Sequence, residues 1–81
     1  MSVQFERDNE NYVYQLVSRN IKKQRQLKKL TQEQLANKIN YSKQFISNIE
    51  SKNHQTFGLG TLWAIALALE INISVLFDEN E

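Results

Sequence analysis

Helical repeats of apolar positions alternate with short polar links along the 81 residues. From about Asn9 the apolar side chains recur at intervals of three and four with polar residues between them, at Tyr12, Val13, Leu16, Val17 and Ile21. This spacing places them on one face of a helix and predicts a first helix that runs to about Lys28. Basic residues in its last turns complement the negative end of the helix dipole.

The next segment carries several signals for the start of a second helix. Thr31 can cap it, and Gln34, three residues later, can complete a capping box. Leu30 can pack on Leu35 as a hydrophobic staple. The apolar stripe ends at Asn40, a residue type that tolerates the left-handed conformation with which a helix can end without glycine. We expect this helix to bury Leu35, Ala36 and Ile39.

A third helix follows after a very short link. Ser42 offers another cap, and Tyr41 can pack on Ile46 as a second staple. The apolar positions predict a buried stripe of Phe45, Ile46 and Ile49. Two short helices separated by about three residues predict a helix-turn-helix.

The remaining pattern predicts two more helices. Residues 51–60 are polar and hold both glycines, which makes them the longest internal loop, and residues 59–69 are apolar on nearly every face. Asn72 can cap a last short helix with Ile73, Leu76 and Phe77 on its apolar side. Because proline is absent and glycine occurs only at 58 and 60, we predict an all-α fold. We expect an N-terminal extension at 1–10, one helix-turn-helix domain at 11–77 and a frayed acidic tail at 78–81.

The ordered motifs carry a resemblance to a known family. The segments IKKQRQLKKLTQEQLANKINYSKQFISNIESKN and TLWAIALALEINISVLF resemble the helix-turn-helix family of phage repressors and Cro proteins, over about residues 17–77. The resemblance implies a lambda-repressor-like bundle of five short helices. It also implies a sequence-specific transcriptional regulator that binds a palindromic operator on double-stranded DNA as a homodimer. Asn40 and Glu70 stand where many members have glycine.

The same resemblance implies roles for particular residues. The third helix would enter the major groove, where side chains read base edges; the candidates for base reading are Lys43, Gln44, Ser47 and Asn48. Those for phosphate contact are Gln32 at the start of the second helix, together with Lys22, Ser42, Lys52 and Asn53. Arg25 and Glu50 match a pair that ties the first helix to the end of the recognition helix.

Charge changes the picture once its distribution is considered. The chain carries ten Lys and Arg against nine Asp and Glu, a net charge of +1 that argues against a nucleic-acid partner. Residues 19–52, however, hold nine of the basic residues and two of the acidic ones, a net of +7, which leaves −6 for the rest. Such asymmetry is expected of a surface that meets phosphate, although a run of lysines is also typical of a solvated helix face.

The apolar fourth helix raises the question of what covers it. Trp63, Ala64 and Leu67 occupy positions that are often charged in similar proteins, and a monomer of this size can hardly bury every face. Either the N-terminal Val3, Phe5 and Tyr12 cover this helix or a second subunit does. The expected dimer interface consists of Trp63, Leu67, Ile73 and Phe77.

Other classes of protein find little support. The sequence has no cysteine and no glycine-rich phosphate motif, and its one histidine, His54, lies in a predicted loop. We therefore expect neither an enzyme nor a metal, cofactor or small-molecule site. No apolar run is long enough for a membrane span, and we expect a cytoplasmic protein. One alternative is a protein-interaction module of the same fold, an antitoxin or adaptor. Restriction-modification controllers form a sub-class that the sequence does not separate from phage regulators.

Overall fold

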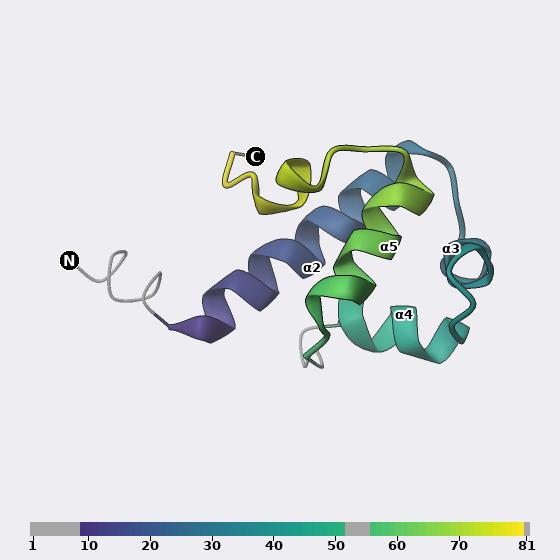
Figure 1. Cartoon of the computed structure of the whole chain (residues 1–81), viewed down its shortest axis with the longest axis horizontal. Helices are drawn as coiled ribbons and strands as arrows, with labels where there is room; N and C mark the ends of the chain where they lie inside the picture. Colours follow the sequence, from purple (N-terminus) through teal and green to yellow (C-terminus); the bar gives the residue numbers. More distant parts are fainter. Residues whose placement is uncertain (1–8, 52–55, 81) are drawn as a thin grey trace.

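The computed structural model describes residues 9–51 and 56–80, and in these ranges every regular element is helical. The elements are α2 (Glu10–Leu27), α3 (Gln32–Lys38), α4 (Lys43–Glu50), α5 (Leu59–Leu69) and the 3-10 helix η1 (Ile73–Phe77) (Figure 1). The all-α prediction is confirmed. The expected fifth helix differs in type, because five residues leave room for little more than a 3-10 turn.

Side-chain caps mark the start of α2, α3 and α4. The Thr31 hydroxyl accepts from the Gln34 backbone N–H at 3.0 Å, and the Gln34 side chain accepts from the Thr31 N–H at 2.8 Å, which completes the predicted capping box. Ser42 accepts from the Phe45 N–H at 3.1 Å and so caps α4 as predicted. Asn9 caps α2 in the same way. These bonds satisfy amides that have no partner within their helices.

Three helices end without glycine in a left-handed residue. Lys29, Asn40 and Glu70 have φ values of 60°, 61° and 59° and follow α2, α3 and α5. In each case the next amide, at Leu30, Tyr41 or Ile71, donates to the carbonyl five residues earlier at 2.9–3.1 Å. This is the bond of a Schellman motif, which satisfies free carbonyls at the helix end. The conformation predicted for Asn40 is present, and Glu70 adopts it as well.

All five elements contribute to one core. Its fully buried side chains come from α2 (Ile21), α3 (Leu35), α4 (Ile46, Ile49), α5 (Ile65, Leu69) and η1 (Leu76). The N-terminal half of α2 projects beyond the other helices, and α3 and α4 lie together at its opposite end (Figure 1). The core therefore holds α4 in a fixed orientation relative to α2 and α5.

Two details of the α3–α4 region differ from the prediction. The Tyr41 ring lies on Phe45, with the centroids 4.3 Å apart, so Phe45 takes the place expected for Ile46 in the staple. Phe45 is only partly buried because it lies between the core and this exposed tyrosine. The Tyr41 hydroxyl also lies 3.1 Å from that of Thr61 on α5.

Hydrogen bonds join the start of the acidic tail, at Asp78 and Glu79, to α2. The buried Asn20 amide donates to the carbonyls of Leu76 and Asp78 at 2.9 and 2.8 Å. The Tyr12 hydroxyl donates to the Glu79 carboxylate at 2.7 Å. The two bonds from Asn20 give hydrogen-bond partners to the backbone carbonyls of Leu76 and Asp78, which therefore do not depend on water. Within residues 9–51 and 56–80, no helix is both long and apolar enough to cross a membrane.

Candidate nucleic-acid interface

Helix α4 presents a polar outer face because its apolar side is fixed in the core. Ile46 and Ile49 are fully buried. Lys43 and Gln44, in its first turn, are exposed, and Ser47 and Asn48, one turn later, are partly exposed. The structure thus places all four candidate base-reading residues on one short helix, with the two nearest its N-terminus most accessible.

An ionic network fixes the carboxyl end of α4. The Arg25 guanidinium donates to both oxygens of Glu50, from Nε at 2.7 Å and from Nη2 at 2.9 Å, and from Nη1 to the Leu30 carbonyl at 2.7 Å. The two side chains are 10% and 2% exposed, so the paired charges lie in the protein interior. The pair that the resemblance implied is present in this bidentate form.

Gln32 extends this network to the start of α3. Its side-chain Nε2 donates to Glu50 Oε1 at 3.1 Å, so α2, α3 and α4 meet at one carboxylate. Sequence reasoning assigned Gln32 to phosphate and missed this contact; the glutamine follows the Thr31 cap, which could have indicated that it faces the neighbouring helix end. This hydrogen bond holds the Gln32 side chain, at the start of α3, beside the carboxyl end of α4.

Within α4 the side chains of Gln44 and Asn48 interact. Gln44 Nε2 donates to Asn48 Oδ1 at 2.8 Å across one helical turn. Residues four apart lie over one another on a helix, which brings these two amides together. Two of the four candidate base readers are therefore a hydrogen-bonded pair.

Of the remaining phosphate candidates, the structure places Lys22 and Ser42 near the two ends of α4. Lys22 is exposed on α2 and lines, with Arg19 and Ser51, an open hollow of about 510 Å³ beside the carboxyl end of α4. The Ser42 oxygen accepts the capping bond, which leaves its hydroxyl hydrogen for another acceptor. Lys52 and Asn53 lie outside the described residues.

Comparison with known proteins identifies the family. A family model described as Helix-turn-helix matches residues 21–76. The chain belongs to the helix-turn-helix family. Its structure is similar to the crystal structure of a tyrosine-to-phenylalanine mutant of the restriction-modification controller protein C.Esp1396I, with a TM-score of 0.74, 39% sequence identity and 82% of each chain covered. The search of curated proteins gave no match.

Family membership makes this helix-turn-helix protein a DNA-binding regulator of transcription. The part of the chain that matches the model runs from the middle of α2 to η1 and so contains α3, the turn and all of α4. The polar face of α4 and the ionic network therefore lie in the part of the molecule by which the family is defined.

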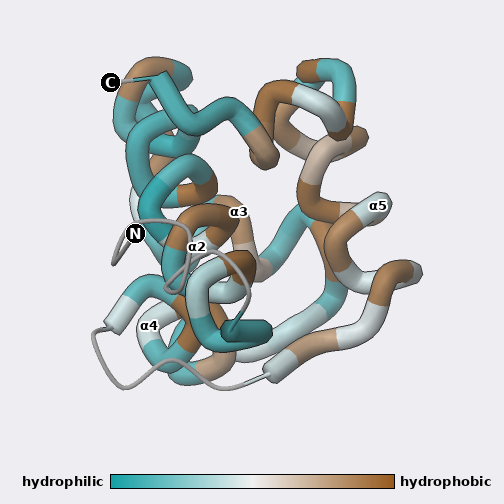
Figure 2. The backbone as a smooth tube through the Cα atoms, turned by 90° about the vertical axis from the view of Figure 1, so that its left-hand side faces the viewer, coloured by the Kyte–Doolittle hydropathy of each residue, from teal (hydrophilic) through white to brown (hydrophobic). Residues whose placement is uncertain are grey.

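A second surface, on α5, is apolar rather than polar. Leu59, Trp63 and Leu67 are 74%, 53% and 59% exposed. Most of α5 is coloured hydrophobic in Figure 2, whereas polar residues interrupt the turns of α2. Of the other residues assigned to the dimer interface, Phe77 is 41% exposed and Ile73 is half-buried.

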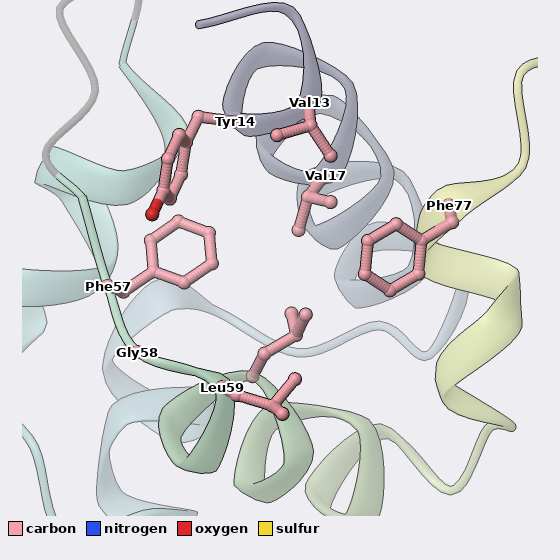
Figure 3. A pocket seen from close by; sticks show the side chains of 8 residues that line it. Val13, Tyr14, Val17, Phe57, Gly58, Leu59 and Phe77 are labelled. Carbon is pink, nitrogen blue, oxygen red and sulfur yellow. The ribbon is translucent and has the colours of Figure 1, made fainter. Parts of the chain in front are cut away.

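An apolar pocket of about 210 Å³ continues from this surface between α2, α5 and η1. Figure 3 shows Val13 and Val17 of α2 opposite Phe57 and Leu59, with Phe77 closing one side. Tyr14 packs edge-on against Phe57, with ring centroids 5.3 Å apart. Val3 and Phe5, the alternative cover for the fourth helix, lie outside the described residues.

Proposed function

We propose that this helix-turn-helix protein binds a specific operator in double-stranded DNA as a homodimer, with one α4 in each of two successive major grooves. The observation that carries the proposal is the polar face of α4, held rigid by the core on one side and by the Arg25–Glu50 pair at its end. A short helix fixed in this way fits a groove about 12 Å wide.

The charges around α4 support a phosphate partner. Its first turn contains no acidic residue and begins with Lys43, so the positive end of the helix dipole stays uncompensated. Arg19 and Lys22 line the hollow at the opposite end of α4. We assign the DNA backbone contacts to Lys22, Gln32, Ser42, Lys52 and Asn53, because contacts of this kind position a protein without reading sequence.

Base reading is assigned to the outer face of α4. Lys43 suits the acceptors of guanine, and Gln44 can donate to and accept from adenine. Ser47 and Asn48 lie one turn further along on the same polar face. Because each bidentate contact discriminates by about 1–3 kcal/mol, two or three of them give useful selectivity.

The exposed apolar residues of α5 support a second copy of the chain as the other partner. A two-fold axis through this surface would bury Trp63 and Leu67 of both subunits. Such a dimer binds a palindrome whose half-sites are about 34 Å apart. The similarity to a restriction-modification controller favours that sub-class of cytoplasmic regulator over a phage repressor.

The decisive experiment selects bound sequences from random duplexes. We expect a palindromic site, bound with an affinity that falls steeply with salt because phosphate contacts release counterions. Gln44→Ala should reduce the preference at one base pair by about 1–3 kcal/mol, whereas Gln32→Ala should weaken all sequences alike. No enriched sequence together with a flat salt response would reject the proposal and favour an acidic protein partner.

A further inference from the structure

We infer that Gln44 and Asn48 act as one unit in which Asn48 positions the Gln44 amide to read an adenine, rather than reading a base itself. The inference rests on the proposed function and assigns the two residues different tasks within it. It starts from the 2.8 Å hydrogen bond that joins their side chains across one turn of α4.

The direction of the bond determines which groups of Gln44 stay available. Nε2 donates one hydrogen to Asn48 Oδ1. A side-chain amide has two such hydrogens and a carbonyl oxygen with two lone pairs, so one N–H and the Oε1 acceptor remain. Adenine presents an acceptor at N7 and a donor at N6 in the major groove, and it needs one donor and one acceptor in return.

The positions of the two residues in α4 agree with this division. Gln44 is the second residue of the helix and Asn48 the sixth, so Asn48 lies about 6 Å further along the axis. In helix-turn-helix docking the N-terminal residues of the recognition helix contact base edges. Gln44 is exposed and Asn48 partly exposed, so the glutamine is the more accessible of the two.

Positioning matters because an exposed glutamine has many rotamers. A free side chain of this type loses considerable rotamer entropy when it is fixed against a base. The bond to Asn48 limits that freedom before DNA arrives, and preorganisation of this kind strengthens binding without a new contact. The benefit applies only to duplexes that Gln44 can recognise, so Asn48 influences selectivity at the base pair of Gln44.

The test measures base preference in four variants with the selected operator and its single-base substitutions. We expect Gln44→Ala to lower the preference for one A·T pair roughly tenfold, and Asn48→Ala to lower the preference for the same pair about threefold to tenfold. The double variant should lose no more than Gln44→Ala alone. Asn37→Ala, an exposed asparagine on α3, serves as the control and should leave the preference unchanged.

Asn48→Asp separates positioning from contact. Its carboxylate keeps the acceptor for Gln44 Nε2, so the preference for the A·T pair should remain while the added negative charge weakens binding to every duplex. A loss of preference at a different base pair in Asn48→Ala, or additive losses in the double variant, would overturn the inference. Selection of no sequence by the wild-type protein would instead reject the proposed function itself.

Discussion

The two exposed surfaces of this molecule share one core and differ in almost everything else. On the α3–α4 side, polar and basic side chains lie over Ile46 and Ile49, and a buried ion pair fixes the helix end. On the α5 side, Trp63 and Leu67 project from a helix whose opposite face is equally apolar. Hydrogen bonds and an ion pair fix the side chains near the first surface, whereas the second surface consists of apolar side chains exposed to solvent.

This difference shows that a small domain can carry a polar and an apolar surface on one core. A polar face that reads bases needs fixed geometry, because a displaced donor loses its hydrogen bond. An apolar face needs a large contact area, because the free energy gained on burial is proportional to the apolar surface removed from water. Substitutions in the two regions should therefore affect different measurements.

The largest effect is expected from breaking the ion pair. Arg25→Met leaves the 2% exposed Glu50 carboxylate with the Gln32 amide as its main partner, and removal of one member of a buried pair costs about 3–5 kcal/mol. Urea unfolding should show this loss of stability. Arg19→Met, on the exposed side of α2, is the control and should change stability by less than about 0.5 kcal/mol.

A double variant sharpens the same prediction. Arg25→Met with Glu50→Leu removes both charges and should recover much of the lost stability, because apolar replacement of a buried pair is often neutral. If the single variant unfolds like wild type, the pair does not hold α4, and the contrast between the two surfaces is wrong on its polar side.

Trp63→Glu tests the apolar side. Adding a charge to the centre of α5 should weaken the dimer at least about 30-fold, in the range of residues that dominate interfaces, while the fold stays intact because Trp63 is 53% exposed. Sedimentation equilibrium should then give the monomer mass. Gln26→Glu adds the same charge on exposed α2 and should stay dimeric; an unchanged mass for Trp63→Glu would direct attention to the N-terminal residues as the cover.

Thr31→Ala tests the directional bonds at the start of α3. Loss of the capping box should reduce stability by about 1 kcal/mol and should reduce DNA affinity with little change in dimer mass. Thr56→Ala, at an exposed position between α4 and α5, is the matched control. Equal unfolding midpoints for the two variants would show that the cap contributes nothing to the polar side.

The smallest effect is expected at the helix ends. Glu70→Gly keeps the left-handed backbone and removes its steric cost, about 1–2 kcal/mol for a residue with a Cβ, against an entropy cost of about 0.5–1 kcal/mol for glycine. The net result should be a stabilisation of about 0.5–1 kcal/mol, visible as a higher Tm. Asn40→Gly should gain less, because asparagine tolerates φ of 61° better than glutamate does; the reverse order would contradict the strain argument.

Local chemistry made part of this molecule predictable from sequence. Thr31 and Ser42 cap as expected because a cap involves only residues two or three positions away. The left-handed conformation of Lys29 had no signal in the sequence, because a lysine side chain does not favour it. At Glu70 the sequence left the conformation open, because a glutamate stands where many family members have glycine. Asn20 gave no signal because its acceptors lie more than fifty residues away.

The candidate site divides in the same way. The position of Lys43, Gln44, Ser47 and Asn48 on one helix followed from periodicity, and their roles on DNA stay predictions. The Arg25–Glu50 pair followed from the family resemblance. The contacts of Gln32 with Glu50 and of Gln44 with Asn48 depend on rotamers, which helical spacing restricts and does not determine.

The Asn20 amide also has a consequence for the order of events in folding. It joins positions 56 and 58 residues apart in the chain, whereas α3 and α4 are consecutive helices. Closing the longer loop costs more chain entropy, so the helix-turn-helix is expected to form early and the Leu76 segment to dock late. Interactions that form after the folding transition state mainly affect the unfolding rate. The hydrogen bonds of Asn20 with Leu76 and Asp78 should therefore slow unfolding and have little effect on the folding rate.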